Sequence, residues 1–75
     1  MKDKIFQIVS KIMEIPLNDI NIDSSPDTIA NWDSLRHIKL ILAIEEILNI
    51  QFSDDEIVSI TNVRSLIDNI EKREI

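Results

Sequence analysis

The sequence lacks cysteine and glycine altogether, and it has a single histidine. Without cysteine the chain can form no disulfide framework and no thiolate metal site, and one histidine cannot build a zinc site alone. Without glycine it has neither a glycine-rich phosphate loop nor a dinucleotide-binding fingerprint. These absences exclude several nucleotide-dependent and zinc-dependent classes of function.

Positive charge is also scarce. The 75 residues include 8 Lys and Arg against 14 Asp and Glu, which gives a formal net charge of −6. An acidic chain repels phosphate backbones, so nucleic-acid binding is not expected. No apolar run is long enough to span a bilayer or to act as a signal sequence. We therefore expect a cytoplasmic protein that does not insert into membranes. We also expect it to be a monomer.

The remaining composition is that of a folded domain. A hydrophobic fraction of 44% is typical of a globular chain and too high for a disordered acidic tail. A length of 75 residues suffices for one small domain, and the sequence shows no internal repeat. We therefore expect residues 1–75 to form a single domain.

The spacing of the apolar residues is helical in the first segment. It predicts a helix over residues 4–14, with Asp3 as its N-cap and Pro16 beyond its end. Residues 15–33 hold both prolines and no positive charge, which indicates a long loop. The helical stripe consists of Ile5, Ile8, Val9 and Ile12, and four residues are expected to pin the loop to the core: Leu17, Ile20, Ile22 and Ile29.

A second helix is predicted to begin at Asp33 or Ser34 and to end near Asn49. Its apolar residues cover such a wide arc that the helix should pack on several neighbours at once, as the central helix. Three charged residues fall on the opposite arc: Arg36, Lys39 and Glu46.

Two further helices follow. Ser53 and Glu56 form a capping box, which predicts a short helix over residues 54–59. A last apolar stripe predicts a helix over residues 63–73. The expected fold class is therefore all-α: a four-helix bundle of three main helices and one short helix, with a long loop between the first two helices.

The acidic loop is a candidate metal site. Asp19, Asn21 and Asp23 resemble the opening of a calcium-binding EF-hand loop. However, Ser24 stands where that loop needs glycine, and Ala30 stands where it needs a bidentate glutamate. We therefore expect turn chemistry here and no metal.

Ser34 has three possible roles. It lies three residues before His37, so the two could act as nucleophile and base, although the chain lacks a glycine-rich nucleophile elbow. It could be an attachment point, because a helix N-terminus favours a phosphate group. It could also be an ordinary first-turn residue of a helix that Asp33 caps.

The residues around this serine carry a resemblance. The stretch Asn31-Trp32-Asp33-Ser34-Leu35, followed by Ile38, Leu40 and Ala43-Ile44-Glu45-Glu46, is similar to the acyl carrier proteins, and the likeness covers nearly the whole chain. It implies that Ser34, between Asp33 and Leu35, is esterified by 4′-phosphopantetheine from coenzyme A, through a phosphopantetheinyl transferase. The thiol of this arm would carry acyl or aminoacyl groups as thioesters to enzymes that load and transfer them. The chain itself would not be an enzyme.

The sequence also departs from the family pattern. Fatty-acid carriers usually have a small residue before the aspartate and acidic residues early in the next helix. Trp32, Arg36 and Lys39 stand at these positions. This makes the chain similar to stand-alone carriers of specialised pathways, such as surface polysaccharide, polyketide or aminoacyl-transfer systems. We take five residues as candidate docking positions: Trp32, Arg36, Lys39, Glu45 and Glu46.

Two acidic blocks fit a carrier. Residues 14–33 and 45–56 each contain five acidic residues and no basic one. Such blocks suit weak, fast, electrostatically steered contacts with several enzymes. The alternatives are a small helical adaptor that binds a partner helix through its apolar arc and a minimal hydrolase that uses Ser34 and His37.

Overall fold

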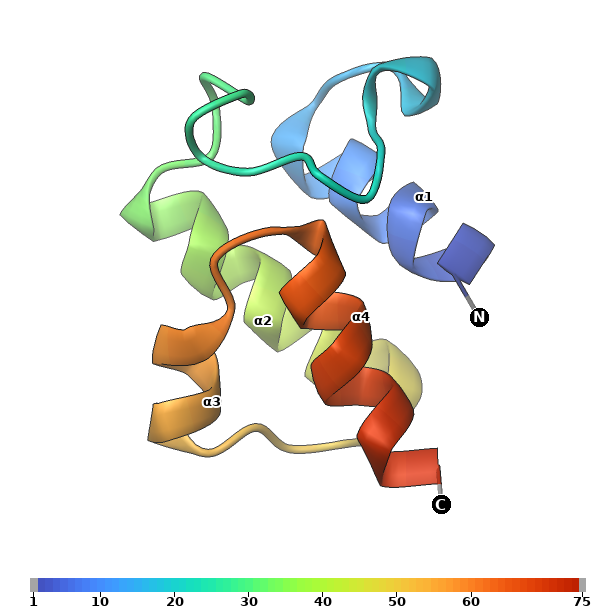
Figure 1. The fold of residues 1–75 in the computed structure, drawn as a ribbon, viewed down its shortest axis with the longest axis vertical. Helices are drawn as coiled ribbons and strands as arrows, with labels where there is room; N and C mark the ends of the chain where they lie inside the picture. Colours follow the sequence, from blue (N-terminus) through green and yellow to red (C-terminus); the bar gives the residue numbers. More distant parts are fainter. Residues whose placement is uncertain (1, 75) are drawn as a thin grey trace.

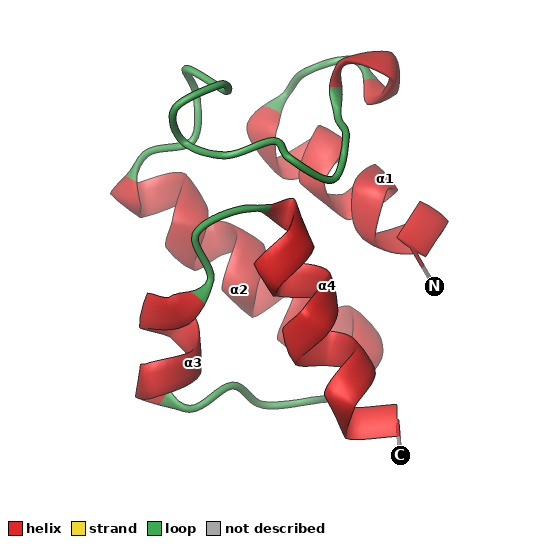
Figure 2. Ribbon diagram, in the orientation of Figure 1, coloured by secondary structure: helices red, strands yellow, loops and turns green. Residues whose placement is uncertain are grey.

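Within residues 2–74, the chain forms four helices and two short 3₁₀ turns (Figures 1 and 2). The computed structural model describes residues 2–74, the last of them by its backbone alone. The helices are α1 (Lys2–Met13), α2 (Ser34–Leu48), α3 (Asp54–Ser59) and α4 (Val63–Glu71), and the 3₁₀ turns span Leu17–Asp19 and Lys72–Glu74. Residues 2–74 contain no strand. The predicted all-α fold, with its long loop between the first two helices, is confirmed.

The helix ends differ slightly from the prediction. α1 begins at Lys2, so Asp3 lies in its first turn rather than at its N-cap, where its charge still complements the helix dipole. α1 ends at Met13, because Glu14 adopts a left-handed backbone with φ of 57°. α4 ends at Glu71, and the chain continues as a 3₁₀ turn where one continuous helix to residue 73 was expected.

The core lies between α1, α2 and α4, with contributions from the loop and from the segments on either side of α3. It consists of Ile5, Ile8, Val9, Met13, Ile20, Ile29, Trp32, Leu40, Ile41, Ile44, Phe52, Ile60, Val63, Leu66, Ile67 and Ile70. The short helix α3 supplies no fully buried residue, and its Ile57 packs against the core half-buried. α3 is therefore the helix with the fewest buried anchors in the part of the chain that is described.

The loop between α1 and α2 is attached to the start of α4. The backbone N–H groups of Val63 and Arg64 donate to the carbonyls of Ser24 and Ile22, both at 2.9 Å. Arg64 also pairs with Asp23 at 2.8 Å. In Figure 1 this part of the loop crosses the upper end of α4. The first amides of α4, which lack partners inside the helix, are thus satisfied by the loop.

Two predictions about burial were wrong. Leu17, expected to pin the loop, is 46% exposed. On α2 only Leu40, Ile41 and Ile44 are buried, so the wide apolar arc does not pack all round. The exposed apolar residues of α2 are Leu35, Ile38, Leu42 and Ile47, at 63%, 47%, 58% and 49%. The neighbouring helices cover one side of α2 and leave this second side open.

The helices are also short. None of those described is both long and apolar enough to cross a bilayer.

Candidate functional site

Ser34 is the first residue of α2, and its side chain is exposed to solvent. Asp33 is the N-cap: its Oδ1 accepts a hydrogen bond from the backbone N–H of Arg36 at 2.8 Å, and its carbonyl accepts from that of His37 at 2.9 Å. The capping role expected for Asp33 is confirmed. The cap fixes the first turn and holds the serine hydroxyl at the surface.

A groove opens beside Ser34. It has a volume of about 530 Å³, and three parts of the chain form it: the end of the loop, the first turn of α2 and the link between α3 and α4. The lining residues are Pro26, Trp32, Asp33, Ser34, His37, Ile38, Ile60 and Thr61. Its walls are therefore largely apolar, with polar groups near the serine.

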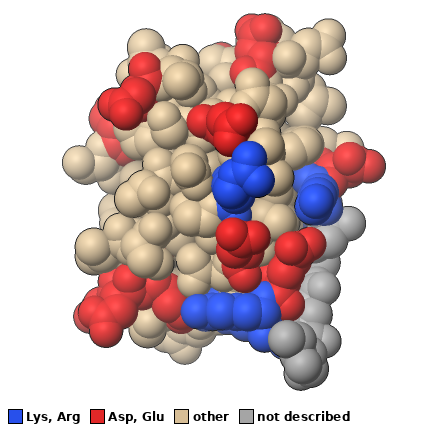
Figure 3. Space-filling view, in the orientation of Figure 1, with Lys and Arg blue, Asp and Glu red and all other residues tan. Residues whose placement is uncertain are grey.

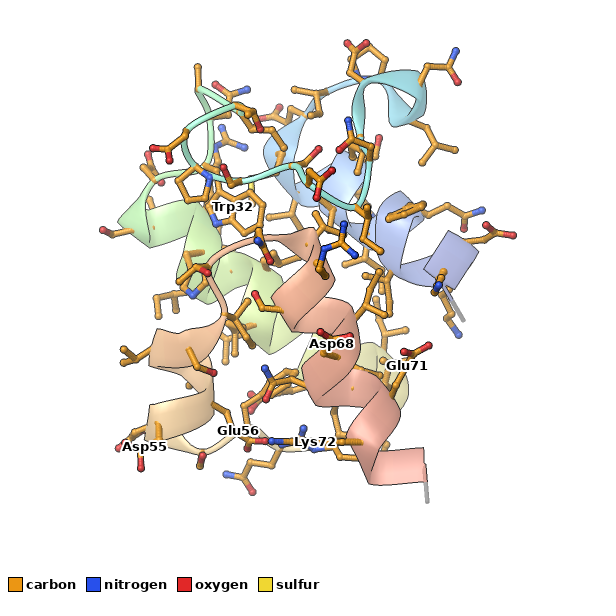
Figure 4. All side chains as sticks on the ribbon, in the orientation of Figure 1. Trp32, Asp55, Glu56, Asp68, Glu71 and Lys72 are labelled. Atoms are coloured by element: carbon orange, nitrogen blue, oxygen red, sulfur yellow. The ribbon has the colours of Figure 1, made fainter. Side chains whose placement is uncertain are left out.

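Trp32 and His37 join three elements at this groove. Trp32 is only 4% exposed, and Figure 4 shows it between the loop and the start of α2. Its Nε1–H donates to His37 Nδ1 at 3.1 Å, and the two rings are stacked at 23° with centroids 6.2 Å apart. His37 Nε2 lies 3.2 Å from the carbonyl oxygen of Ile57 on α3. The interpretation of Trp32 as a ring that covers the loop-to-helix junction agrees with this burial, and a direct docking contact stays a prediction.

We expected Arg36 to lie on the exposed arc of α2, but its side chain is bound to the end of α1. Its Nη1 donates to the carbonyl of Ile12 at 2.7 Å, and its Nη2 pairs with Glu14 at 2.7 Å. Only 28% of its side chain is exposed. The arginine thus caps the C-terminus of α1, where a positive charge complements the helix dipole. Lys39 is exposed.

The acidic docking candidates divide in the same way. Glu45 is half-buried, and its Oε2 accepts a hydrogen bond from the backbone N–H of Phe52 at 2.8 Å, whereas Glu46 is exposed. Glu45 therefore has a structural role in the link that follows α2, and Glu46 is available to a partner.

The second acidic block is anchored to the C-terminal end of the chain. The capping box of Ser53 and Glu56 is present, as predicted. The Glu56 carboxylate also pairs with Arg73 at 2.6 Å and with Lys72 at 3.1 Å. The Ser53 backbone N–H, then Arg73 and Lys72, lower the pKa of Glu56 from 4.5 to about 2. Figure 3 shows Lys and Arg lying between Asp and Glu on the face that carries α4.

The two other chemical interpretations of the sequence find little support in this geometry. Both ring nitrogens of His37 already have partners in Trp32 and Ile57, and no hydrogen bond described in residues 2–74 joins the ring to Ser34. In the acidic loop, Asn21 Oδ1 accepts a bond from the Asp23 backbone N–H at 2.8 Å, which is turn chemistry. No group of three possible metal ligands occurs among the residues described.

Sequence reasoning missed two features of the site. The exposed strip of α2 did carry a signal, because its apolar arc was wider than three short neighbours could cover. The attachment of Arg36 to α1 left no signal in the sequence, because it joins residues 24 apart that meet only through tertiary packing.

Comparison with known proteins identifies the family. A family model described as the phosphopantetheine attachment site matches residues 3–70. The acyl carrier protein of Buchnera aphidicola subsp. Schizaphis graminum is 34% identical over 73 residues, which cover 97% of this chain and 92% of the relative. The acyl carrier protein of Cyanidium caldarium is 36% identical over 67 residues, which cover 89% of this chain and 78% of the relative. The acyl carrier protein of Coprothermobacter proteolyticus is 30% identical over 74 residues, which cover 93% of this chain and 90% of the relative.

The chain therefore belongs to the phosphopantetheine-attachment family, in which these relatives are acyl carrier proteins. It is a carrier rather than an enzyme. Its cofactor is 4′-phosphopantetheine, whose thiol holds the carried group as a thioester, and carriers of this kind work with transferases and biosynthetic enzymes.

Proposed function

We propose that Ser34 is the residue that carries the phosphopantetheine arm. Its hydroxyl is exposed at the edge of the groove and takes part in no hydrogen bond described for residues 2–74. All the other serines use their hydroxyl groups within the fold: Ser10, Ser24, Ser25, Ser53, Ser59 and Ser65. This contrast is the observation that carries the proposal.

The first turn of α2 suits a phosphodiester. The oxygens of Asp33 accept hydrogen bonds from the backbone N–H groups of Arg36 and His37. The backbone N–H groups of Ser34 and Leu35 have no partner among the described hydrogen bonds. Amide N–H groups at a helix N-terminus favour an anion. A phosphopantetheinyl transferase would move the arm from coenzyme A to Ser34 Oγ, with adenosine bisphosphate as the leaving group.

We further propose that partners dock on the exposed side of α2. Leu35, Ile38 and Leu42 follow the serine along one strip of this helix, and all three are exposed. Lys39 and Glu46 add charges next to the strip. Trp32 and Arg36 act on this surface indirectly, because they fix the position of α2 against the loop and α1. An apolar strip with a charged border suits brief contacts with several enzymes.

The charge of this surface supports a specialised carrier rather than the fatty-acid synthesis carrier. The first half of α2 has a positive charge at Lys39 where fatty-acid carriers usually have acidic residues. The carried group would then be an acyl or aminoacyl group of a specialised pathway, delivered by a monomeric, single-domain, cytoplasmic carrier.

Intact mass spectrometry tests the attachment site. Incubation with a broad-specificity phosphopantetheinyl transferase, Mg²⁺ and coenzyme A is expected to add one phosphopantetheinyl group. Ser34→Ala should abolish the addition, whereas Ser59→Ala, which changes another exposed serine, should retain it. An addition that persists in a folded Ser34→Ala variant would show that the arm is attached elsewhere.

A further inference from the structure

We propose that the 3₁₀ turn after α4 holds α3 in place through a latch, which consists of Lys72, Arg73 and Glu56. The two basic residues belong to that turn, and Glu56 lies in α3. When the latch is lost, α3 opens as a local unit while the rest of the fold stays packed. The inference concerns the opening of α3 alone and is independent of attachment at Ser34.

α3 has few apolar anchors of its own. None of its residues is fully buried, and Ile57 packs against the core half-buried. The nearest core residues lie outside the helix: Phe52 precedes it and Ile60 follows it, at 5% and 3% exposure. From α2, His37 Nε2 adds one contact, 3.2 Å from the carbonyl oxygen of Ile57. The segment can therefore open at a small cost in apolar surface, and its polar contacts decide how firmly it is held.

Arg73 connects this segment to α4. Its Nη2 donates to Glu56 Oε1 at 2.6 Å and to the carbonyl of Gln51 at 3.0 Å. Its Nη1 donates to the carbonyl of Asn69 at 2.6 Å. Its guanidinium carbon also lies 4.7 Å from the centre of the Phe52 ring, where a cation is attracted to the aromatic face. One side chain thus contacts α3, the link before it and the last turn of α4.

The ion pairs of Glu56 are partly shielded from water. The side chains of Arg73 and Glu56 are 22% and 19% exposed. In the other ion pair of α4, those of Arg64 and Asp23 are 54% and 76% exposed. Lys72 Nζ adds a second contact with Glu56, at 3.1 Å from Oε2, and Figure 4 shows the lysine reaching toward this carboxylate. Because partly buried pairs are screened less than surface pairs, the latch holds α3 more firmly than a surface ion pair would.

Residue-resolved amide hydrogen exchange, measured by NMR on the unmodified chain, tests the latch. The reporters for α3 are the backbone N–H groups of Ile57 and Ile60, which donate to the carbonyls of Ser53 and Glu56, and the N–H of Leu66 reports on α4. Rates are compared at one pH, at which opening and closing are faster than exchange. In the wild type the two α3 amides should exchange at least about tenfold faster than Leu66, because local opening needs less free energy than global unfolding.

Arg73→Gln should speed up exchange of the α3 amides by about tenfold, and that of Leu66 by at least as much, because the latch is broken both when α3 opens and when the whole chain unfolds. Arg36→Ala is the matched control, since this arginine also binds a carbonyl and a carboxylate, but at the end of α1. It should speed up Leu66 and leave the α3 amides within about twofold of the wild type, because its contacts persist when α3 opens.

A double variant tests whether Arg73 acts on α3 through Glu56. Glu56→Gln keeps an oxygen for the Ser53 backbone N–H, so the capping box is retained, but it loses the charge. Its α3 amides should exchange about tenfold faster than those of the wild type, and adding Arg73→Gln should change them by less than about twofold. If Arg73→Gln does not fold, Arg73→Lys keeps the charge, loses the planar fork and should speed up α3 exchange by about threefold.

Three results would overturn the proposal. α3 amides that keep their wild-type rates in Arg73→Gln, or in Arg73→Lys if that variant replaces it, would mean that α3 opens with these contacts intact. Wild-type α3 amides as slow as Leu66, or α3 amides that speed up as much in Arg36→Ala as in Arg73→Gln, would mean that α3 opens only with the whole fold. Effects of Glu56→Gln and Arg73→Gln that multiply in the double variant would mean that Arg73 acts on α3 without Glu56.

Discussion

The attachment of Arg36 to α1 can be tested quantitatively. In Arg36→Ala the carbonyl of Ile12 loses a charged donor at 2.7 Å, and Glu14 loses its ion partner. A hydrogen bond to a charged group contributes about 1.5–3 kcal/mol, and we take the low end because the side chain is 28% exposed. The ion pair adds about 0.3 kcal/mol, because 68% of the Glu14 side chain faces solvent.

The expected loss in the free energy of unfolding is therefore about 2 kcal/mol, which corresponds to a fall in melting temperature of about 10 °C for a domain of this size. Urea unfolding followed by far-UV circular dichroism measures the loss. Lys39→Ala removes an exposed charge from the same helix and should stay within about 0.5 kcal/mol of the wild type.

Three further variants separate the two contacts of Arg36. Arg36→Lys keeps the charge but loses the planar fork, so it should lose about half as much stability as Arg36→Ala. Glu14→Gln should cost less than about 0.5 kcal/mol, and in the Arg36→Ala background it should cost nothing more. Equal stability of Arg36→Ala and Lys39→Ala would refute the reasoning, because Arg36 would then be a solvated charge after all.

Three other predictions follow from the charges. Because Arg36 supports the fold, the repulsion of fatty-acid synthesis enzymes should be tested with Lys39→Glu alone. For the holo form of this variant, kcat/KM of a fatty-acid malonyl transferase should rise about threefold at low salt. An unchanged kcat/KM would mean that Lys39 does not repel that enzyme. The pKa of Glu56 is lowered to about 2, so its stabilisation is complete above about 4.5 and is lost as the pH falls towards 2. Acid unfolding of Glu56→Gln should therefore depend less steeply on pH in this window, and identical slopes would contradict the assignment. Because the net charge is −6, NaCl should raise the melting temperature by screening repulsion, and a steady fall would show that attractive pairs dominate.

The sequence alone determined the helices and most of their ends. The capping box of Ser53 and Glu56 was readable because its partners lie three residues apart in one helix turn. The N-cap role of Asp33 was readable for the same reason, because its side chain bonds to the amide three residues on. Pro16 indicated a break after α1, although the helix already ends at Met13, before the left-handed Glu14. Spacing within one element depends on local geometry, which a short stretch of residues specifies by itself. The family resemblance rested on equally local residues around Ser34.

The tertiary structure decided which of these residues are free to meet a partner. Arg36 and Lys39 look equivalent in the sequence, yet the first is bound to α1 and the second is exposed. The apolar arc of α2 could not reveal which side would be covered, since that depends on where three separate helices pack. The bridge from Trp32 through His37 to Ile57 spans 5 and then 20 residues and closes only when the loop, α2 and α3 meet. Contacts at such separations arise from packing between elements, and no local pattern records them.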